Sequence, residues 1–550
     1  MGILQKLWLW SERPIETLGR AAFVIALAGI VSRLLGFIRD RLLASSFGAG
    51  DLLDAYYVAF RLPDLIYGFL VLGALSAAFI PVFTELIAHE ERERAWRLVQ
   101  GAIQWLVIFL GGAAIIGMIF ASELALLIAP GFSPEKQSLV ALLTRIMLIS
   151  PIFLSVSAVF GGVLVSFKQF IAYSFAPVFY NLGIIIGIVL FFPVLGPIGL
   201  AWGVVLGAFL HMSIQFPAFR RAGYRLHFVP LLATWRDTAL QKVVRLMVPR
   251  SLTVAINQLS LVIVTVFAST LASGSLAAFT LAINIQSIPL GLFGIAFSLA
   301  SFPILSSLAA KKEHGEFFKV FSQTVKRILY FVIPLSFLLI IFRAEIVRIV
   351  LGTGAFNWED TILTFTVLGW LSFSLFAQCL IPLFVRAFFA LQDTRTPLYA
   401  ALAAEGIHLS LIPFLLPRYE IAGLAMAFSI GSIVNILILY VALRRRLEGW
   451  KDREIALGVS RIFIVSLVAA LIAQYSKGIF ALTIGRLDTF IEVAAKFGMG
   501  AVIGTVTYLM LSSYFKLPEY LQIKRFIWCR LLRQPETVAL TEDHPEKGSW

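Results

Sequence analysis

The feature that most limits how this chain can fold is a long succession of apolar stretches, each about twenty residues long and nearly free of charge. Such a stretch crosses a bilayer as an α-helix, because the hydrocarbon core is about 30 Å thick and each helical residue advances about 1.5 Å. With 59% hydrophobic and 14% charged residues, the composition excludes an ordinary soluble domain. The sequence predicts an all-α polytopic membrane protein of about fourteen transmembrane helices. The candidate spans lie near residues 20–46, 58–88, 97–121, 138–166, 171–192, 197–219, 244–272, 277–309, 324–351, 361–392, 397–416, 420–443, 458–477 and 489–513.

Two basic, polar segments divide these spans into groups of six, six and two. The first segment runs from Arg220 to Lys242 and the second from Arg444 to Arg461. Five regions follow from this division: residues 1–225 form an N-terminal lobe, 226–242 an amphipathic, basic linker, 243–446 a C-terminal lobe, 447–515 the last two spans, and 516–550 a cytoplasmic tail.

The two groups of six resemble an internal repeat. The run Phe79 to Phe83 has a counterpart at Phe302 to Leu305, and the run Ala44 to Gly50 has one at Ala268 to Gly274, displaced by nearly the same length. Because each group has an even number of spans, both copies start on the same side of the membrane. This arrangement is a parallel repeat, which is typical of transporters.

The distribution of Lys and Arg predicts the orientation. Loops after even-numbered spans are rich in these residues, whereas loops 195–197 and 273–276 carry no charge. The positive-inside rule therefore places both termini in the cytoplasm. The net charge of +14 is then a consequence of topology and not a sign of nucleic-acid binding. Cys379 and Cys529 have no neighbours at metal-ligand spacing, so we expect neither a disulfide nor a metal or other cofactor.

Charged residues inside the first apolar region are the candidate functional residues. Arg33, Arg39, Asp54 and Arg61 lie between Ser32 and Pro81, and an ionisable group at bilayer depth costs about 2.5–3.5 kcal/mol on insertion scales unless it faces a bundle interior or a watery cavity. Two interpretations are open: the charges line a polar pathway, or those at helix ends extend to the interface. For Arg33, in the middle of a span that is otherwise uncharged, we favour the pathway.

Several motifs, in the order in which they occur along the chain, resemble those of the MurJ (MviN) lipid II flippases of the MOP exporter superfamily. They are SRLLGFIRD, FGAG, DAYYVAFRLP and AAFIPVF in the first half, FAPVFYN at 175–181, and IPLGLFGIA and RAFFALQDTRTP in the second half. The resemblance covers most of residues 20–450. It implies two six-helix lobes, two C-terminal helices with a hydrophobic groove, and export of the undecaprenyl-pyrophosphate-linked peptidoglycan precursor, lipid II, across the bacterial inner membrane by alternating access. We expect the protein to be a monomer.

The resemblance also assigns roles to individual residues. Arg33 and Arg39 match arginines of the family's central cavity, Asp54 matches an acidic residue at its outer end, and Arg61 stands at a basic position before Leu-Pro. The chemistry fits, because the planar guanidinium of Arg binds a pyrophosphate through two parallel hydrogen bonds that Lys cannot form. For Arg61, the alternative is an interfacial anchor beside the kink at Pro63.

The sequence also departs from the family pattern. Tyr67, Asn284 and Ser287 stand where the family has further charged cavity residues, so a different lipid-linked saccharide is an alternative substrate. A MATE-like small-molecule antiporter is the runner-up function.

Two further constellations have alternative interpretations. Glu405 and His408 share a helical face in the eleventh span and form either a proton relay or a structural hydrogen-bonded pair. Asp51 and Asp54 are the only candidate pair of catalytic carboxylates, and no second acidic cluster, nucleophile motif or phosphate-binding glycine loop accompanies them. The sequence therefore predicts a transporter of a lipid-linked substrate and not an enzyme.

Overall fold

The computed structural model describes residues 18–70, 74–224, 230–447, 450–484 and 490–531, and in these ranges it contains helices and no strand. The all-α prediction is confirmed. Among the described residues, nine helices are long and apolar enough to cross a membrane, or ten if one bent pair counts as a single span. The predicted total of about fourteen stays a prediction, because the spans at 58–88 and 489–513 include positions outside this description.

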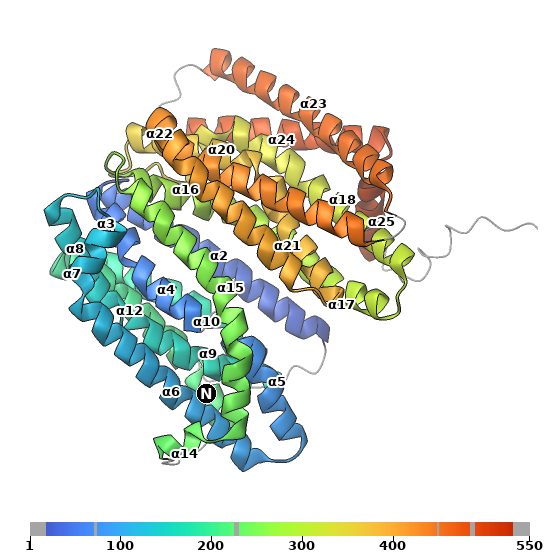
Figure 1. Ribbon diagram of the computed structural model, residues 1–550. Helices are drawn as coiled ribbons and strands as arrows, with labels where there is room; N and C mark the ends of the chain where they lie inside the picture. The colour runs from blue at the N-terminus through green and yellow to red at the C-terminus, as the bar shows by residue number, and fades with distance from the viewer. Residues whose placement is uncertain (1–17, 71–73, 225–229, 448–449, 485–489, 532–550) are drawn as a thin grey trace, which may run out of the picture. The chain divides into compact units, whose positions relative to one another are not determined.

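The helices form two compact units. Figure 1 colours the chain by residue number, from blue near the N-terminus to red near the C-terminus. Unit 1 comprises Met1–Leu281, Val350–Thr364 and Leu409–Leu424, and unit 2 comprises Ala282–Ile349, Phe365–His408 and Ala425–Trp550. The predicted lobes divide the chain by span number and these units divide it by contacts, so the lobe boundaries stay predictions.

Unit 1 is built from long and short helices, and some of the breaks between them contain glycine or proline, as at Gly48, Gly50 and Gly196. They are α2 (Leu18–Phe47), α3 (Asp51–Ala59), α4 (Arg61–Leu70), α5 (Ala74–Ala88), α6 (Arg92–Ile119), α7 (Ala121–Ile128), α8 (Pro134–Met147), α9 (Ser150–Ser166), α10 (Phe170–Ile186), the π-helical η1 (Gly187–Phe191), α11 (Phe192–Leu195), α12 (Pro197–Ser213), α13 (Phe216–Arg221), α14 (Leu231–Trp235), α15 (Thr238–Ala268) and the start of α16 (Ser275–Pro289). Asp237, at the end of the predicted linker, caps α15 by accepting a hydrogen bond from the backbone N–H of Ala239.

Close packing in unit 1 depends on small residues. A Cβ added to Gly183 on α10 would lie 2.3 Å from the Cα of Gly207 on α12, and one added to Gly187 would lie 2.5 Å from the Cα of Gly203. Without side chains at these positions the two backbones approach closely, which is the usual basis of helix association in membranes, where lipid offers no hydrophobic driving force. α10 therefore has a fixed position between α12 and α2, which it also contacts.

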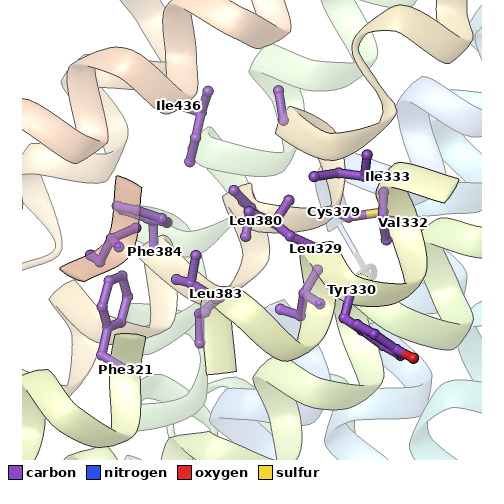
Figure 2. Close-up of a cluster of buried hydrophobic side chains, with 14 of the residues drawn as sticks. Phe321, Leu329, Tyr330, Val332, Ile333, Cys379, Leu380, Leu383, Phe384 and Ile436 are labelled. Atoms are coloured by element: carbon purple, nitrogen blue, oxygen red, sulfur yellow. The ribbon is translucent and has the colours of Figure 1, made fainter. Parts of the chain in front are cut away.

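Unit 2 contains the remaining helices. They are η2 (Leu290–Ile295), α17 (Ala296–Ala310), α18 (His314–Ile341), α19 (Arg343–Leu351), α20 (Trp358–Phe373), α21 (Leu375–Ala390), α22 (Arg395–Arg446), α23 (Asp452–Ile484), α24 (Phe490–Tyr514) and α25 (Pro518–Leu531), with short parts of α19, α20 and α22 assigned to unit 1. Its core, shown in Figure 2, packs α18 through Phe321 and Leu329 against α21 through Leu383 and Phe384. The buried thiol of Cys379 lies in this core. Helix α25 belongs to the predicted cytoplasmic tail, and Gln522 on it accepts hydrogen bonds from Arg327 on α18.

Helix α22 is a hairpin and not one continuous rod. Its 52 residues would form a straight helix about 78 Å long, far more than a bilayer needs. Glu420 has φ 48° and ψ −129°, outside the helical region. Two contacts show that the arms of the hairpin lie side by side. A Cβ added to Gly431 would lie 2.8 Å from the Cβ of His408. Arg446, the last residue of α22, forms an ion pair with Asp393, which lies just before the first residue of the helix. The hairpin corresponds to the two spans predicted at 397–416 and 420–443.

Candidate functional site

Arg39 is held by an amide on the neighbouring helix. Its Nη1 donates a hydrogen bond of 3.0 Å to Oδ1 of Asn181 on α10, and its Nε and Nη2 lie 2.9 and 2.8 Å from Oδ1 of Asp40. Asn181 in turn donates to the backbone carbonyl of Ser32, at 3.2 Å. Asp40 is buried, so Arg39 is not a chain that extends to the interface from a helix end. It is part of a polar network between α2 and α10.

Arg33 has a different environment. It lies six residues before Arg39, which turns it about 240° around the helix at 3.6 residues per turn. Its side chain is exposed, whereas that of Arg39 is partly buried. The structure therefore leaves the guanidinium of Arg33 accessible to a ligand, while the donors of Arg39 are already directed by protein acceptors.

Arg61 connects α4 to α15. Its Nε donates a hydrogen bond of 2.9 Å to Oγ1 of Thr265, which is fully buried. Asp64 lies one turn along the same helix and interacts electrostatically with Arg61. Arg61 is therefore hydrogen-bonded inside unit 1. An arginine that only anchors a helix at the membrane interface would not need this contact.

Tyr57 is a candidate that the sequence analysis missed. Its hydroxyl is buried and has no hydrogen-bond partner among the residues that the structure describes. The ring lies on α3, within electrostatic range of both Arg39 and Arg61. An unsatisfied buried hydroxyl costs about 1–3 kcal/mol, and such a group beside two arginines is a ready donor to an anionic ligand.

Asp54 lies in a second polar cluster at the end of α2 and α3, together with Asp51, Lys136, Gly274 and Ala277. Its buried carboxylate accepts hydrogen bonds of 2.8 Å from Nζ of Lys136 and from the backbone N–H groups of Gly274 and Ala277. These two N–H groups are at the start of α16, where no intrahelical acceptor exists. Asp54 therefore caps a helix that begins more than two hundred residues later, and the cluster joins α3, α8 and α16.

Asp51 completes the Asp54 cluster on its exposed side. Oδ1 of Asp51 accepts hydrogen bonds of 2.7 Å from Nζ of Lys136 and from Oγ of Ser273. The hydrogen bond from Lys136, followed by that from Ser273, lowers the pKa of Asp51 below its ordinary value. Lys136, with only 9% of its side chain exposed, is thus shared between two carboxylates.

The turn Phe47-Gly48-Ala49-Gly50 fits into the same end of unit 1. Gly48 has φ 63°, and the N–H of Ala49 donates a hydrogen bond of 3.1 Å to Oδ2 of Asp360. A Cβ added to Gly274 would lie 1.7 Å from the carbonyl oxygen of Ala49. Because only glycine permits this approach, the turn and the start of α16 form one closely packed surface. This end of unit 1 is closed by protein.

Glu405 and His408 form a pair in unit 2. Nδ1 of His408 lies 2.8 Å from Oε1 of Glu405, and the imidazole is 3% exposed. Phe428 and Gly431 on the returning arm of α22 cover the ring. Nε2 of His408 is buried without a hydrogen-bond partner among the described residues. The pairing predicted from their spacing is present, and one imidazole nitrogen stays available.

Ser287, one of the positions that depart from the family pattern, has a local hydrogen-bond partner. Ser287 donates to the backbone carbonyl of Asn284 at 2.7 Å, one turn earlier on α16.

In the part of the chain that the structure describes, no group of three or more His, Cys, Asp or Glu residues is placed to hold a metal ion.

An apolar groove lies between α18, α23 and α24. It has a volume of about 250 Å³, and its walls are mostly aromatic, aliphatic and small side chains. They are Phe293, Tyr330, Phe331, Pro334, Leu335, Leu338, Ser466, Ala469, Ala470, Gly504, Thr505, Tyr508 and Leu509.

Comparison with known proteins decides the family. The family model described as lipid II flippase MurJ matches residues 43–493. The chain belongs to the MurJ family. The probable lipid II flippase MurJ of Buchnera aphidicola subsp. Acyrthosiphon pisum is 29% identical over 496 residues, covering 88% of this chain and 95% of that protein. The corresponding protein of Rhizobium meliloti is 30% identical over 457 residues, covering 80% and 84%.

Solved structures show the same fold. A lipid II flippase MurJ in an inward closed conformation has a TM-score of 0.75 at 24% identity, covering 90% of this chain and 98% of that chain. An inward-facing multidrug resistance MATE family transporter of the MOP superfamily has a TM-score of 0.64 at 14% identity, covering 76% and 94%. The MurJ-family chain is thus a multi-pass membrane protein of bacterial type, and the resemblance of its motifs to this family is confirmed.

Proposed function

We propose that this MurJ-family protein moves lipid II across the cytoplasmic membrane as a monomer, by alternating access, with both termini in the cytoplasm. The observation that carries the proposal is the match of the family model to residues 43–493, a range that includes Arg61 and Asp54 and begins after Arg33 and Arg39. The transport cycle requires no chemical step, no cofactor and no nucleic acid. The protein supplies binding, two alternative closures and a path for the lipid tail beside the cavity.

Three arginines are the proposed ligands of the pyrophosphate. Arg33 is accessible on α2 and makes the first contact, whereas Arg39 and Arg61 are oriented by Asn181 and Thr265. The hydroxyl of Tyr57 supplies a neutral donor beside them. A guanidinium is always charged and presents its donors in a plane, so these groups recognise the geometry of a phosphate as well as its charge.

The Asp54 cluster is the proposed outer closure. Opening that end requires the carboxylate of Asp54 to release two backbone donors and Lys136. Breaking a buried ion pair without a replacement costs about 3–5 kcal/mol. The free energy of substrate binding must therefore offset a cost of that order. A closure of this strength keeps the outer end shut when no substrate is present.

Complementation tests the function. The chain is expressed in a bacterium whose own lipid II flippase can be switched off, and growth is measured after depletion. Growth is expected with the wild-type chain and with Arg97→Lys, a substitution at an exposed position in the second turn of α6. No growth is expected with Arg39→Ala, provided that membrane fractions contain the protein. Drug resistance without growth would support the MATE-like alternative, and rescue of a different saccharide pathway alone would support the other lipid-linked substrate.

The second part of the proposal is that Glu405 and His408 bind the coupling proton. When Nδ1 of His408 donates to Glu405, Nε2 holds a lone pair that can accept a proton without any other described partner competing for it. The pair can therefore exchange a proton with either side of the membrane as access alternates.

A matched pair of histidines provides the control. His211 in unit 1 is partly buried, and its Nδ1 lies 2.7 Å from Oγ of Ser157 and is satisfied locally. Transport in proteoliposomes is expected to lose its response to an imposed pH gradient in His408→Gln and to keep it in His211→Gln. An unchanged gradient response in His408→Gln and Glu405→Gln would reduce the pair to a structural contact.

A further inference from the structure

Helix α25 (Pro518–Leu531) follows directly on the last predicted span. The matched family range ends at residue 493, so family membership assigns no role to α25. The span α24 ends at Tyr514, and the side chains of Tyr514 and Phe515 are 78% and 55% exposed. Tyrosine rings are enriched at the membrane–water interface, and the three residues from Phe515 to α25 extend over at most about 10 Å. Helix α25 therefore starts close to the level of the interface.

Helix α25 is held against α18 and α24 of unit 2 (Figure 1). Leu517, just before the helix, is 1% exposed, and Tyr520 and Ile523 pack against the core of unit 2. Oε1 of Gln522 accepts hydrogen bonds of 3.1 and 2.9 Å from Nε and Nη2 of Arg327 on α18. These contacts fix the helix, so the rest of its surface is presented in one orientation.

Leu521, Lys524 and Arg525 form one exposed face of α25. Residues three and four positions apart lie on the same face of a helix, and all three side chains are exposed. Among the residues that the structure describes, neither Lys524 nor Arg525 has an ion-pair partner. The surrounding segment is strongly basic, because five of the eighteen residues from Lys516 to Arg533 are basic and one, the buried Glu519, is acidic.

This face has the chemistry that recognises the surface of an anionic bilayer. Lys and Arg near a membrane are attracted to anionic headgroups, and apolar side chains enter the boundary between headgroups and acyl chains. The positive-inside rule accounts for cations on the cytoplasmic side. It does not account for Leu521, which is 40% exposed beside two cations on a fixed helix. An apolar side chain and two cations on one face are explained together by contact with lipid.

We propose that Leu521, Lys524 and Arg525 dock α25 on anionic phospholipid headgroups of the cytoplasmic leaflet. The two cations bind the phosphates of phosphatidylglycerol-type lipids, and Leu521 enters the boundary between headgroups and acyl chains. The docked helix anchors the end of α24 and, through Gln522 and Arg327, also α18. The assignment of the leaflet rests on the orientation in the proposed function, whereas the docking itself requires no transport.

Lipid binding to the purified full-length chain tests the two cations. Native mass spectrometry measures the apparent Kd of phosphatidylglycerol and of zwitterionic phosphatidylcholine. Each cation is expected to contribute about fivefold, or about 1 kcal/mol. Lys524→Gln/Arg525→Gln should therefore weaken phosphatidylglycerol binding about twentyfold and phosphatidylcholine binding little. Lys311→Gln/Lys312→Gln makes the same charge change at exposed positions before α18. This matched control should weaken phosphatidylglycerol binding less than about twofold.

A fluorescent reporter tests the position of Leu521. Leu521→Cys, in a chain with Cys379→Ala and Cys529→Ser, is labelled with nitrobenzoxadiazole and placed in phosphatidylcholine nanodiscs with or without phosphatidylglycerol. Emission is expected to shift to shorter wavelength when phosphatidylglycerol is present. The shift should be lost in about 1 M salt, where the Debye length falls to about 3 Å. A label on Glu313→Cys, also an exposed position, should show no shift.

Several outcomes would overturn this docking. Equal phosphatidylglycerol affinity in wild type and Lys524→Gln/Arg525→Gln would do so, and an equal loss in the control variant would show a response to net charge alone. Competition by soluble glycerol phosphate would identify a site for free phosphate. An emission shift only in nanodiscs that hold two chains would identify a contact between copies. Lipid binding through Lys524 and Arg525 in a chain that fails complementation would overturn only the lipid II function.

Discussion

At the scale of single residues, a substitution of Arg33 distinguishes recognition of phosphate geometry from simple electrostatic attraction. Arg33→Lys keeps the charge on the exposed face of α2 but removes the planar pair of donors. A charge-assisted contact contributes roughly 1.5–3 kcal/mol, so substrate capture is expected to fall about ten- to a hundredfold, and complementation should fail at native expression levels. Because Arg33 is accessible and not part of the network around Asn181, the amount of folded protein should not change.

Two controls accompany this substitution. Arg97→Lys on α6 should complement fully, and Arg33→Ala should fail while reaching the membrane in normal amount. Full growth with Arg33→Lys would mean that Arg33 acts only as a cation that shapes the local potential.

The pH dependence of the Asp54 cluster is also determined by single residues. The pKa of Asp51 is lowered in the folded protein by hydrogen bonds from Lys136 and Ser273. Its ionised form therefore stabilises the fold fully above the ordinary pKa of about 3.9, and this stabilisation is lost as the pH falls through the lower, folded pKa. With 68% of the Asp51 side chain exposed, solvent screening keeps the contribution below about 1 kcal/mol.

Thermal unfolding in detergent measures this effect. Asp51→Asn is expected to unfold at a lower temperature than wild type at pH 7, and the difference should be smaller at pH 3, below the ordinary pKa of about 3.9. Glu93→Gln, on the exposed start of α6, should change the unfolding temperature little at either pH. A wild-type advantage that persists undiminished at pH 3 would contradict the linkage.

At the scale of elements, the hairpin of α22 depends on one strained residue. Glu420 has φ 48°, a backbone conformation that non-glycine residues adopt at a cost of about 1–3 kcal/mol. Glu420→Gly is expected to stabilise the protein by about 1 kcal/mol, since glycine relieves the strain. Glu420→Ala keeps a Cβ and should give no such gain. Chemical or thermal unfolding of the two variants distinguishes relief of strain from loss of the charge, which would raise the stability of both equally.

The sequence indicates where the helices lie more directly than it indicates which residues they contact. Apolar length locates each span, and α2 (Leu18–Phe47) agrees closely with the window at 20–46. The same pattern could not reveal that Asp54 caps α16, because a hydrogen bond between positions 220 residues apart leaves no local periodicity. Lys136 had no signal beyond a charge in a loop, and its position follows from the packing of α8 against α3.

Tyr57 illustrates the same limit for the candidate site. The sequence places it next to Tyr56 in a short apolar helix, where an aromatic residue ordinarily indicates packing. Only the folded arrangement shows that its hydroxyl is buried without a described partner near two arginines. The predicted arginines Arg39 and Arg61 are each bonded to a different helix. The proposed binding roles of these two arginines therefore rest on their chemistry and on family membership. Substituting each arginine separately in the complementation assay tests these roles.

At the scale of the whole molecule, the orientation in the membrane is the prediction on which the site assignments depend. The alternation of basic and uncharged loops predicts cytoplasmic termini, and the structure indicates where a label can be attached. Ala129 is fully buried and unsuitable, whereas Val194, at the end of the fifth predicted span, is 81% exposed. Glu313, in the basic connection before α18, is exposed as well.

Single cysteines at these two positions, in a chain with Cys379→Ala and Cys529→Ser, test the orientation in intact cells. A membrane-impermeant maleimide is expected to modify Val194→Cys from outside and Glu313→Cys only after the membrane is permeabilised. The reverse pattern would invert the topology. It would place the Asp54 cluster at the cytoplasmic face. The cluster would then close the side of entry, because an outer closure requires this end of α3 to face away from the cytoplasm.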